Sequence, residues 1–353
     1  MKKLLRLHIL ALIMLLPVTG IAQKKAKFPP EKDMKAYLMV YFKDETHGLY
    51  FALSKDGYSF TDVNQGKPII AGDTIAEQKG IRDPYIYRGA DGMFYTVLTD
   101  LHIYAQKAGY RNTEWERDGK QFGWGNNRGL VIMQSPDLVH WKHHVLRVDQ
   151  AFPGLENIGC AWAPEVIYDE VKKLPMVYFT MRKGVEKEKV YYAYMSENFD
   201  KMLTEPKPIF EYPKPFAYID ADITKVGNKY HMFYASHDGT SGVKQAVSDS
   251  INTGYQFDDK WYDPEPKGCE APTVYKLIGQ DKWILCYDIY RINPNNFGFS
   301  ETTDFVNFKN LGHFNEGVMK ATNFSQPKHA AFIQLTKKEA QRLADNWKLD
   351  MKF

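Results

Sequence analysis

Short hydrophobic runs, each ended by a turn signal, follow one another along most of the chain. In one recurring pattern a strand-like run leads to Ser, a short turn containing Asp or Asn, and an aromatic residue. This pattern predicts a β-hairpin. It occurs five times, at Leu49–Phe60, Leu130–Trp141, Val190–Phe199, Lys244–Phe257 and Phe297–Phe308, with Ser54, Ser135, Ser196, Ser248 and Ser300 as the turn serines. We expect these hairpins to form the outer strands of a repeated unit, with the aromatic residues packed between units.

A second pattern, two strand-like runs joined by a turn, supplies the inner strands of each unit. Four copies are continuous, at Asp83–Leu98, Trp162–Thr180, Asp220–Tyr234 and Glu270–Tyr287. The fifth is divided between the chain ends, with His329–Leu335 as the innermost strand and Ala36–Phe42 beside it. Pairing of these two runs would close a ring and leave only short sheet edges. The sequence therefore predicts an all-β, five-bladed β-propeller, closed by N- and C-terminal strands in one blade.

The two ends of the chain have their own signals. Residues 1–22 combine Lys2, Lys3 and Arg6 with a short apolar run and small residues, which predicts a signal peptide that is too short to span a membrane. Residues 23–353 are expected to form a single catalytic propeller domain. Its end, from Thr336 to Trp347, reads as a short helix with Glu339 three residues after the cap.

Charge and cysteine content narrow the function classes. The chain has a formal net charge of +3, and loss of the three leader cations leaves about zero, so neither nucleic acid nor membrane is an expected partner. A leader without a Cys at the proposed cleavage site predicts a periplasmic or extracellular protein. Cys160, Cys269 and Cys286 are expected to be buried thiols, with a Cys160–Cys269 bridge as the alternative. CxxC pairs are absent from the sequence, so structural zinc is not expected.

Three acidic residues stand at the heads of predicted innermost strands: Asp83 before Pro84, Asp220 after Ile219, and Glu270 before Ala271. A propeller gathers these strand starts around one axis, so the three carboxylates would share one pocket. Such a pocket suggests glycoside hydrolysis. Each acid taken alone could instead be an ordinary strand or turn cap.

Four motifs, in the right order and at blade spacing, resemble the family 43 glycoside hydrolases over nearly the whole mature chain. They are Arg82-Asp83-Pro84, Trp162-Ala163-Pro164-Glu165, Ile219-Asp220-Ala221 and Glu270-Ala271-Pro272. The resemblance implies that Asp83 is the general base and Glu270 the general acid. It implies that Asp220 modulates the pKa of the acid and orients it.

The chemistry of inverting hydrolysis also requires a set of carboxyl groups, independently of the family resemblance. One ionised carboxylate activates water, and one protonated carboxyl lies across the sugar, roughly 6.5 to 9.5 Å away. A carboxyl that acts as an acid near neutral pH needs surroundings that raise its pKa, and Asp220 would supply the negative charge.

Further residues are candidates for contact with substrate: Trp162, Glu165, Arg291, His329 and Trp124. Trp162 could stack on a sugar or fill the axis. His329 could contact substrate, lie near an axial ion, or simply pack. The long segment 101–129, with Tyr104, Tyr110, Trp115, Phe122 and Trp124, reads either as a sugar-binding rim loop or as a hydrophobic plug.

The chain departs from the family pattern at three places. Ala271 stands where Gly is usual, Asp222 adds an acid that strand alternation puts on the same side as Asp220, and Lys328-His329-Ala330 replaces Arg-His-Gly. The last change leaves open an axial Ca²⁺, although no cofactor is expected to be required.

The sequence favours an inverting hydrolase that releases terminal sugars from plant or microbial oligo- or polysaccharides. The favoured activity is that of an α-L-arabinofuranosidase. β-D-Xylosides and β-D-galactofuranosides are alternative substrates within the family. Rival readings are a five-bladed phosphorylase, for which no compact Arg, Lys and His cluster is evident, and a non-catalytic carbohydrate-binding propeller.

Overall fold

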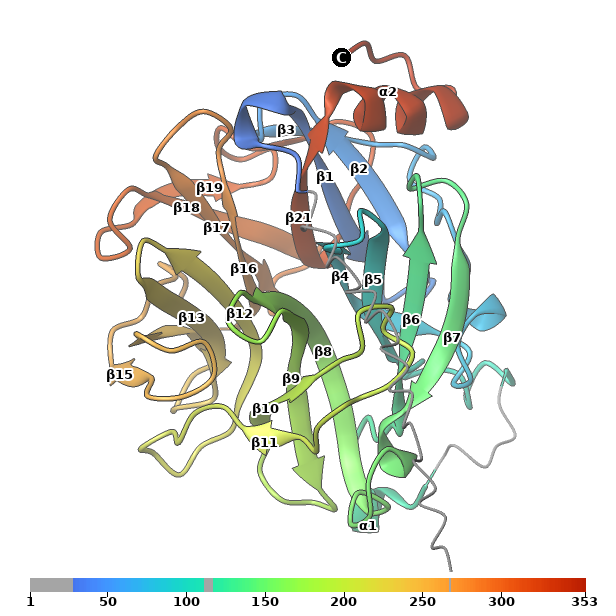
Figure 1. Cartoon of the computed structure of the whole chain (residues 1–353), viewed down its shortest axis with the longest axis vertical. Coiled ribbons are helices and arrows are strands. Elements are labelled where there is room, and N and C mark those ends of the chain that lie inside the picture. Colours follow the sequence, from blue (N-terminus) through green and yellow to red (C-terminus); the bar gives the residue numbers. More distant parts are fainter. Residues whose placement is uncertain (1–27, 111–116, 267) are drawn as a thin grey trace, which may run out of the picture.

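Five β-sheets, antiparallel except for the pairing of β20 with β3, surround a central axis in the computed structural model, which describes residues 28–110, 117–266 and 268–353 (Figure 1). The predicted signal peptide and Trp115 lie outside the described residues. Four sheets are continuous in sequence: β4 (Ile81–Arg88), β5 (Phe94–Asp100), β6 (Gly129–Ser135) and β7 (Lys142–Arg147); β8 (Ile158–Asp169), β9 (Leu174–Lys183), β10 (Lys189–Tyr194) and β11 (Lys207–Pro208); β12 (Tyr218–Val226), β13 (Lys229–Ser236), β14 (Gly242–Ser248) and β15 (Gln256–Asp258); β16 (Cys269–Lys276), β17 (Trp283–Ile289), β18 (Asn296–Thr302) and β19 (Lys309–His313).

The remaining sheet joins the two ends of the chain. Its strands are β1 (Met34–Phe42), β2 (Tyr50–Ser54), β3 (Ser59–Asp62), β20 (Lys320–Ala321) and β21 (Lys328–Thr336), in the order β20-β3-β2-β1-β21. The innermost strand β21 runs antiparallel to β1, with Leu38 opposite Ile333. The predicted five-bladed β-propeller and its closure are therefore confirmed.

Polar turns close the outer hairpins, and their hydrogen bonds explain the recurring Ser and Asp. The Ser54 hydroxyl accepts from the Gly57 amide, and the Asp56 carboxylate accepts from Tyr58 and Ser59 amides. The fifth copy differs from the prediction: its turn is built on Thr302, whose hydroxyl accepts from two backbone amides, and not on Ser300, which lies inside β18.

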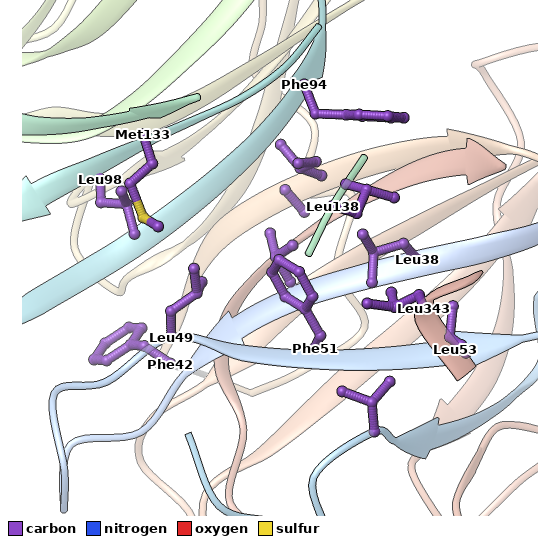
Figure 2. Close-up of a cluster of buried hydrophobic side chains, with 14 of the residues drawn as sticks. Leu38, Phe42, Leu49, Phe51, Leu53, Phe94, Leu98, Met133, Leu138 and Leu343 are labelled. Atoms are coloured by element: carbon purple, nitrogen blue, oxygen red, sulfur yellow. The ribbon is translucent and has the colours of Figure 1, made fainter. Parts of the chain in front are cut away.

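Hydrophobic faces of neighbouring blades pack against one another. Figure 2 shows one such cluster, in which Leu38 and Phe51 from the closing blade meet Phe94 and Met133 from the next blade. All four are buried, which is the main favourable contribution to folding. Leu343 belongs to the same cluster and comes from α2 (Lys337–Asn346), so the helix covers this side of the closing blade.

The predicted C-terminal helix is present with its capping box. Thr336 accepts from the Glu339 amide, and the Glu339 carboxylate accepts from the Thr336 amide. Glu339 also forms a bidentate pair with Arg88 of β4, at 2.5 and 2.9 Å. The remaining helical elements are short: α1 (Gly119–Phe122) and the 3-10 turns η1 (Glu31–Asp33), η2 (Gly72–Thr74) and η3 (Val148–Gln150).

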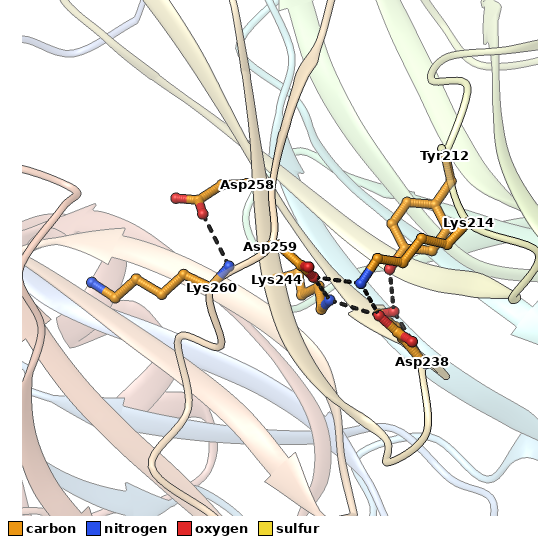
Figure 3. Close-up of polar contacts among 8 residues, drawn as sticks. Tyr212, Lys214, Asp238, Lys244, Asp258, Asp259 and Lys260 are labelled. Carbon is orange, nitrogen blue, oxygen red and sulfur yellow. Dashed lines mark hydrogen bonds and ion pairs between the residues drawn. The ribbon is translucent and has the colours of Figure 1, made fainter.

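Two lysines and two aspartates alternate in a charge square at the blade formed by β12–β15 (Figure 3). Lys214 lies 2.5 Å from Asp238 and 2.7 Å from Asp259, and Lys244 pairs with the same two carboxylates. Lys244 is buried, with 1 % of its side chain exposed, whereas Asp259 is well exposed.

Cys160, Cys269 and Cys286 are free and buried, which confirms the expected buried thiols; the alternative Cys160–Cys269 bridge is not formed. Within the described ranges, no helix has the length and apolar character needed to cross a membrane.

Candidate active site

The five innermost strands share a backbone irregularity where they reach the axis. One residue in each strand has a left-handed φ, between 43° and 53°, and the register with the second strand is interrupted there. Such bulges re-aim side chains and are common beside active sites. The five residues are Asp83, Ala163, Asp220, Ala271 and His329. In three strands the next residue is Pro84, Pro164 or Pro272, which has no amide hydrogen to leave unpaired.

This alignment corrects the predicted equivalence of the three acids. Asp83 and Asp220 occupy the bulge itself, but the bulged residue of β16 is Ala271. Glu270 stands one residue earlier and is therefore equivalent to Arg82, Trp162, Ile219 and Lys328. The sequence does not show where a strand bends, so the acidic residues alone do not reveal this offset of one residue.

A cavity of about 100 Å³ opens at the axis between these bulges. Its lining includes six of the candidate residues: Asp83, Asp220, Glu270, Trp162, His329 and, from the long insertion, Trp124. The other lining residues are Phe42, Arg82, Leu101, Ile219, Asp288 and Lys328. The fold therefore brings the three predicted acids together from three different blades.

Asp83 is held as a carboxylate. Its Oδ2 accepts from the Thr99 hydroxyl at 2.8 Å, and its Oδ1 lies 3.3 Å from Nδ1 of His329. Burial favours the neutral acid, but His329, Arg82 and Thr99 together outweigh burial and hold the pKa of Asp83 well below its usual range. Burial likewise disfavours the charged imidazole, yet Asp83 raises the pKa of His329. An ionised Asp83 suits the predicted role of general base.

Asp220 has the opposite character. Burial raises its pKa to about 8; His329 opposes the rise, and the negative charges of Glu270 and Asp83 add to it. The Asp220 amide donates to the Thr180 hydroxyl of the preceding blade at 3.0 Å, which fixes the bulge. The raised pKa favours the protonated form of Asp220 near neutral pH.

Glu270 lies beside charged residues that the sequence analysis did not assign to the site. The amino group of Lys328 lies 3.6 Å from Glu270, 3.7 Å from Asp288 and 3.5 Å from Asp44. Arg82 pairs with Asp44 at 2.6 Å. A sequence signal for Asp288 did exist, because it is the one charged residue in the apolar run of β17, Trp283–Ile289.

An aromatic platform forms one side of the cavity. The Trp162 indole donates to the Gly125 carbonyl at 2.9 Å and meets Trp124 edge to face at 6.1 Å between ring centroids. The guanidinium of Arg182 lies 4.7 Å from the Trp162 ring centroid and donates to the Trp124 carbonyl. Trp124 stays 69 % exposed. This arrangement favours the rim-loop reading of the insertion and the platform reading of Trp162.

Glu165 and Asp222 lie outside the cavity lining. The bulge at Asp220 interrupts the strand alternation, so the prediction that Asp222 shares the face of Asp220 is wrong. The Asp222 carboxylate accepts from the Val274 amide and the Thr224 hydroxyl, and burial raises its pKa to about 6. Glu165 is buried and accepts from the Tyr178 hydroxyl at 2.8 Å. Asp222 thus links β12 to β16 of the next blade, whereas the bond of Glu165 lies within its own blade.

Arg291 is exposed and is also absent from the cavity lining. Its guanidinium lies 5.5 Å from the ring centroid of Tyr290. Its contact with substrate, like that of Glu165, stays a prediction of the sequence alone.

The carboxylates at the axis are already paired with cationic side chains, which leaves no set of ligands for Ca²⁺ among the residues that line the cavity. In the described part of the chain, no group of three or more His, Cys, Asp and Glu is placed to hold a metal ion. The place between Asp44, Glu270 and Asp288 is taken by the Lys328 ammonium, and His329 is engaged by Asp83. These residues do not fit a calcium ion.

Comparisons with known proteins agree with this geometry. An α-L-arabinofuranosidase of Bifidobacterium longum is 24 % identical over 291 residues, which are 73 % of this chain and 24 % of that protein. The chain thus spans about a quarter of the length of that relative.

Solved structures share the fold. An α-L-arabinofuranosidase from Clostridium thermocellum superposes with a TM-score of 0.52 at 14 % identity, over 79 % of this chain and 84 % of that one. An endo-arabinase from Bacteroides thetaiotaomicron gives 0.54 at 14 % identity, over 75 % and 92 %. A family model described as a probable glycosyl hydrolase domain, related to glycoside hydrolase family 43, matches residues 32–341, and the chain therefore belongs to this family.

Proposed function

We propose that this protein is an inverting glycoside hydrolase that removes terminal sugars, with an α-L-arabinofuranoside as the preferred substrate. The observation that carries the proposal is the shared cavity of Asp83, Asp220 and Glu270, in which one acid is held ionised while a proton is held beside another. Inverting hydrolysis needs this asymmetry between two carboxyl groups.

The reaction assigns one role to each acid. Asp83 takes a proton from a water molecule, whose oxygen attacks the anomeric carbon. Glu270 gives its proton to the glycosidic oxygen as the bond to the anomeric carbon breaks. Asp220 comes from β12, between β4 and β16 along the chain, and its raised pKa keeps a proton, rather than a negative charge, near the acid at neutral pH. Departure of both products returns the two carboxyls to their starting states by proton exchange with solvent.

The size of the cavity and its walls favour exo action. A volume of about 100 Å³ suits one terminal sugar unit better than a continuous polysaccharide chain. Trp162 and the exposed Trp124 would then stack on the sugar and on the departing unit. The arabinofuranosidase relative supports arabinose over xylose or galactofuranose as the released sugar.

The test is release of 4-nitrophenol from α-L-arabinofuranoside, β-D-xyloside and β-D-galactofuranoside substrates. Asp83→Asn and Glu270→Gln are run beside the parent, with Glu211→Gln, an exposed residue outside the cavity lining, as the control. We expect turnover of the arabinofuranoside, a loss of at least about 100-fold in both cavity variants, and an unchanged control. Proton NMR of the first product should show the inverted anomer. Sugar binding without turnover of any glycoside would instead support a binding propeller.

We propose further that the protein is exported and needs no metal. The charged and apolar pattern of residues 1–22 supports export to the periplasm or beyond. Cell fractionation that leaves the protein in the cytoplasm would contradict it. The lysine at the carboxylate cluster supports metal independence, so dialysis against EDTA should leave kcat/KM unchanged.

A further inference from the structure

Asp288 stands at a position of the repeat where two other blades have a threonine that bonds to the next blade. The residue just before each bulge faces one residue of the second strand: Arg82 faces Thr99, Trp162 faces Thr180 and Glu270 faces Asp288. The threonine hydroxyls accept from the bulged residue of the next blade, Ala163 at 2.8 Å and Asp220 at 3.0 Å.

Asp288 does not make the equivalent bond. Neither of its carboxylate oxygens has a hydrogen-bond partner among the described residues, although the side chain is only 1 % exposed and lines the cavity. A buried polar group left without a partner is costly. The position is therefore not explained by the architecture of the blade.

The arrangement also places two acids directly opposite each other. Glu270 and Asp288 are ladder partners in β16 and β17, and like charges in that relationship repel. The Lys328 ammonium lies 3.6 Å from the Glu270 carboxyl and 3.7 Å from the Asp288 carboxyl. Lys328 and Arg82 are two cations beside three carboxyls, Asp44, Glu270 and Asp288. One carboxyl is therefore left unbalanced, and the Glu270–Asp288 pair is electrostatically stable when it keeps one proton.

The other charged groups around this pair are already engaged. Arg82 is bonded to Asp44, and His329 is paired with Asp83. That leaves Asp220, Glu270 and Asp288 with Lys328. Burial raises the pKa of Asp288 to about 7; Lys328 opposes the rise and Glu270 adds to it. The side chain of Glu270 is 24 % exposed, so Glu270 is the half of the pair that can reach substrate.

We propose that Asp288 and Lys328 are positioning residues that act through Glu270: Asp288 keeps a proton on the Glu270–Asp288 pair, and Lys328 orients the pair and neutralises it after the proton is given. The proposal rests on the proposed hydrolase function. During bond cleavage the proton passes from Glu270 to the glycosidic oxygen, and the carboxylate left behind is balanced by Lys328. The pair then takes one proton from solvent before the next turnover.

Two variants should move the pH profile in opposite directions. In Asp288→Asn, Lys328 is left to stabilise the ionised Glu270, so the basic limb of kcat/KM should move to lower pH by about one unit. In Lys328→Met, two facing carboxyls lack their cation and hold the proton more tightly, so the limb should move to higher pH. If Asp288 and Lys328 only supported the fold, the two variants would not move the basic limb in opposite directions. Shifts of the same sign, or no shift, would overturn the proposal.

The leaving group supplies a second readout. The proton from Glu270 matters less for 4-nitrophenol, which leaves readily as an anion, than for a sugar alcohol. Asp288→Asn should therefore lose about tenfold more activity on an arabino-oligosaccharide than on the nitrophenyl glycoside. Asp249→Asn, an exposed surface pair with Lys229, is the control and should leave the ratio unchanged.

Infrared difference spectra between pH 5 and pH 9 separate this proposal from the proposed function. The parent should show protonated carboxyl bands that titrate near neutral pH, one of them from Asp220. Asp288→Asn and Glu270→Gln should each weaken the remaining band or move it to lower pH, both in the parent and in an Asp220→Asn background. If the parent cleaves no glycoside, the hydrolase assignment fails while these spectra still decide whether the pair shares a proton. An unchanged band in both variants would refute the shared proton.

Discussion

Nδ1 of His329 lies 3.3 Å from Oδ1 of Asp83, and the two residues occupy the same bulged position in neighbouring innermost strands. His329 belongs to the last strand of the chain and Asp83 to the first blade after the closing one. The contact therefore links ring closure to the chemistry of the predicted base, since the C-terminal strand must dock before Asp83 gains its partner.

Loss of this pair should move the acidic limb of the pH profile. His329→Gln keeps hydrogen-bonding capacity but removes the positive charge, so Asp83 should take up a proton at higher pH. We expect the acidic limb of kcat/KM to rise by about one pH unit. His140→Gln, at an exposed imidazole outside the cavity, is the matched control.

The same variant tests the sign of the effect on stability. The raised pKa of His329 contributes stability below about pH 6.5 that is lost as pH rises through the raised value. The lowered pKa of Asp83 contributes stability above about pH 3.9 that is lost in stronger acid. The difference in unfolding free energy between parent and His329→Gln should thus be larger at pH 5 than at pH 9 in urea titrations. A larger difference at pH 9 would contradict the pairing.

The hydrophobic pattern predicted the blades because strand period and turn chemistry are local properties. Ring closure could also be predicted, since two half-units at the chain ends complete one repeat. The bulges could not, because strand alternation says nothing of where a strand bends. Without the bulges, Glu270 aligns with Asp83 and Asp222 falls beside Asp220. Ser300 fits the recurring Ser pattern, but β18 continues to Thr302, which makes the turn bonds.

Burial of the three cysteines predicts slow chemistry at sulfur. Burial raises the pKa of all three thiols well above the usual value, so little thiolate forms at pH 8. We expect an aromatic disulfide reagent to label none of them within minutes in the folded protein and all three in guanidinium chloride. Labelling of fewer than three thiols after unfolding would indicate a disulfide and contradict the free thiols.

In the charge square of the β12–β15 blade, loss of an aspartate and loss of the buried lysine should lower the stability by different amounts. Asp238→Asn leaves the buried Lys244 with one carboxylate fewer, and a buried uncompensated charge is costly. Lys244→Met removes that buried charge, while water and Lys214 still stabilise the exposed acids. Thermal unfolding should therefore show a larger fall in Tm for Asp238→Asn than for Lys244→Met. The reverse order would mean that the ammonium is not desolvated as the structure has it.

Trp124 should contribute to substrate binding more than to the chemical step. It is held by Arg182 through its carbonyl and meets Trp162 at the cavity, yet most of its ring is open to solvent. An exposed aromatic at this place can stack on the departing sugar unit without touching the bond that breaks. Trp124→Ala should raise KM for an arabino-oligosaccharide by about tenfold and change kcat little, which is the signature of lost uniform binding. The smaller nitrophenyl glycoside should be affected less. Trp261→Ala, at a partly exposed tryptophan outside the cavity lining, is the control. A fall in kcat with unchanged KM would instead place Trp124 in the transition state, and equal losses in both tryptophan variants would point to a general effect on folding.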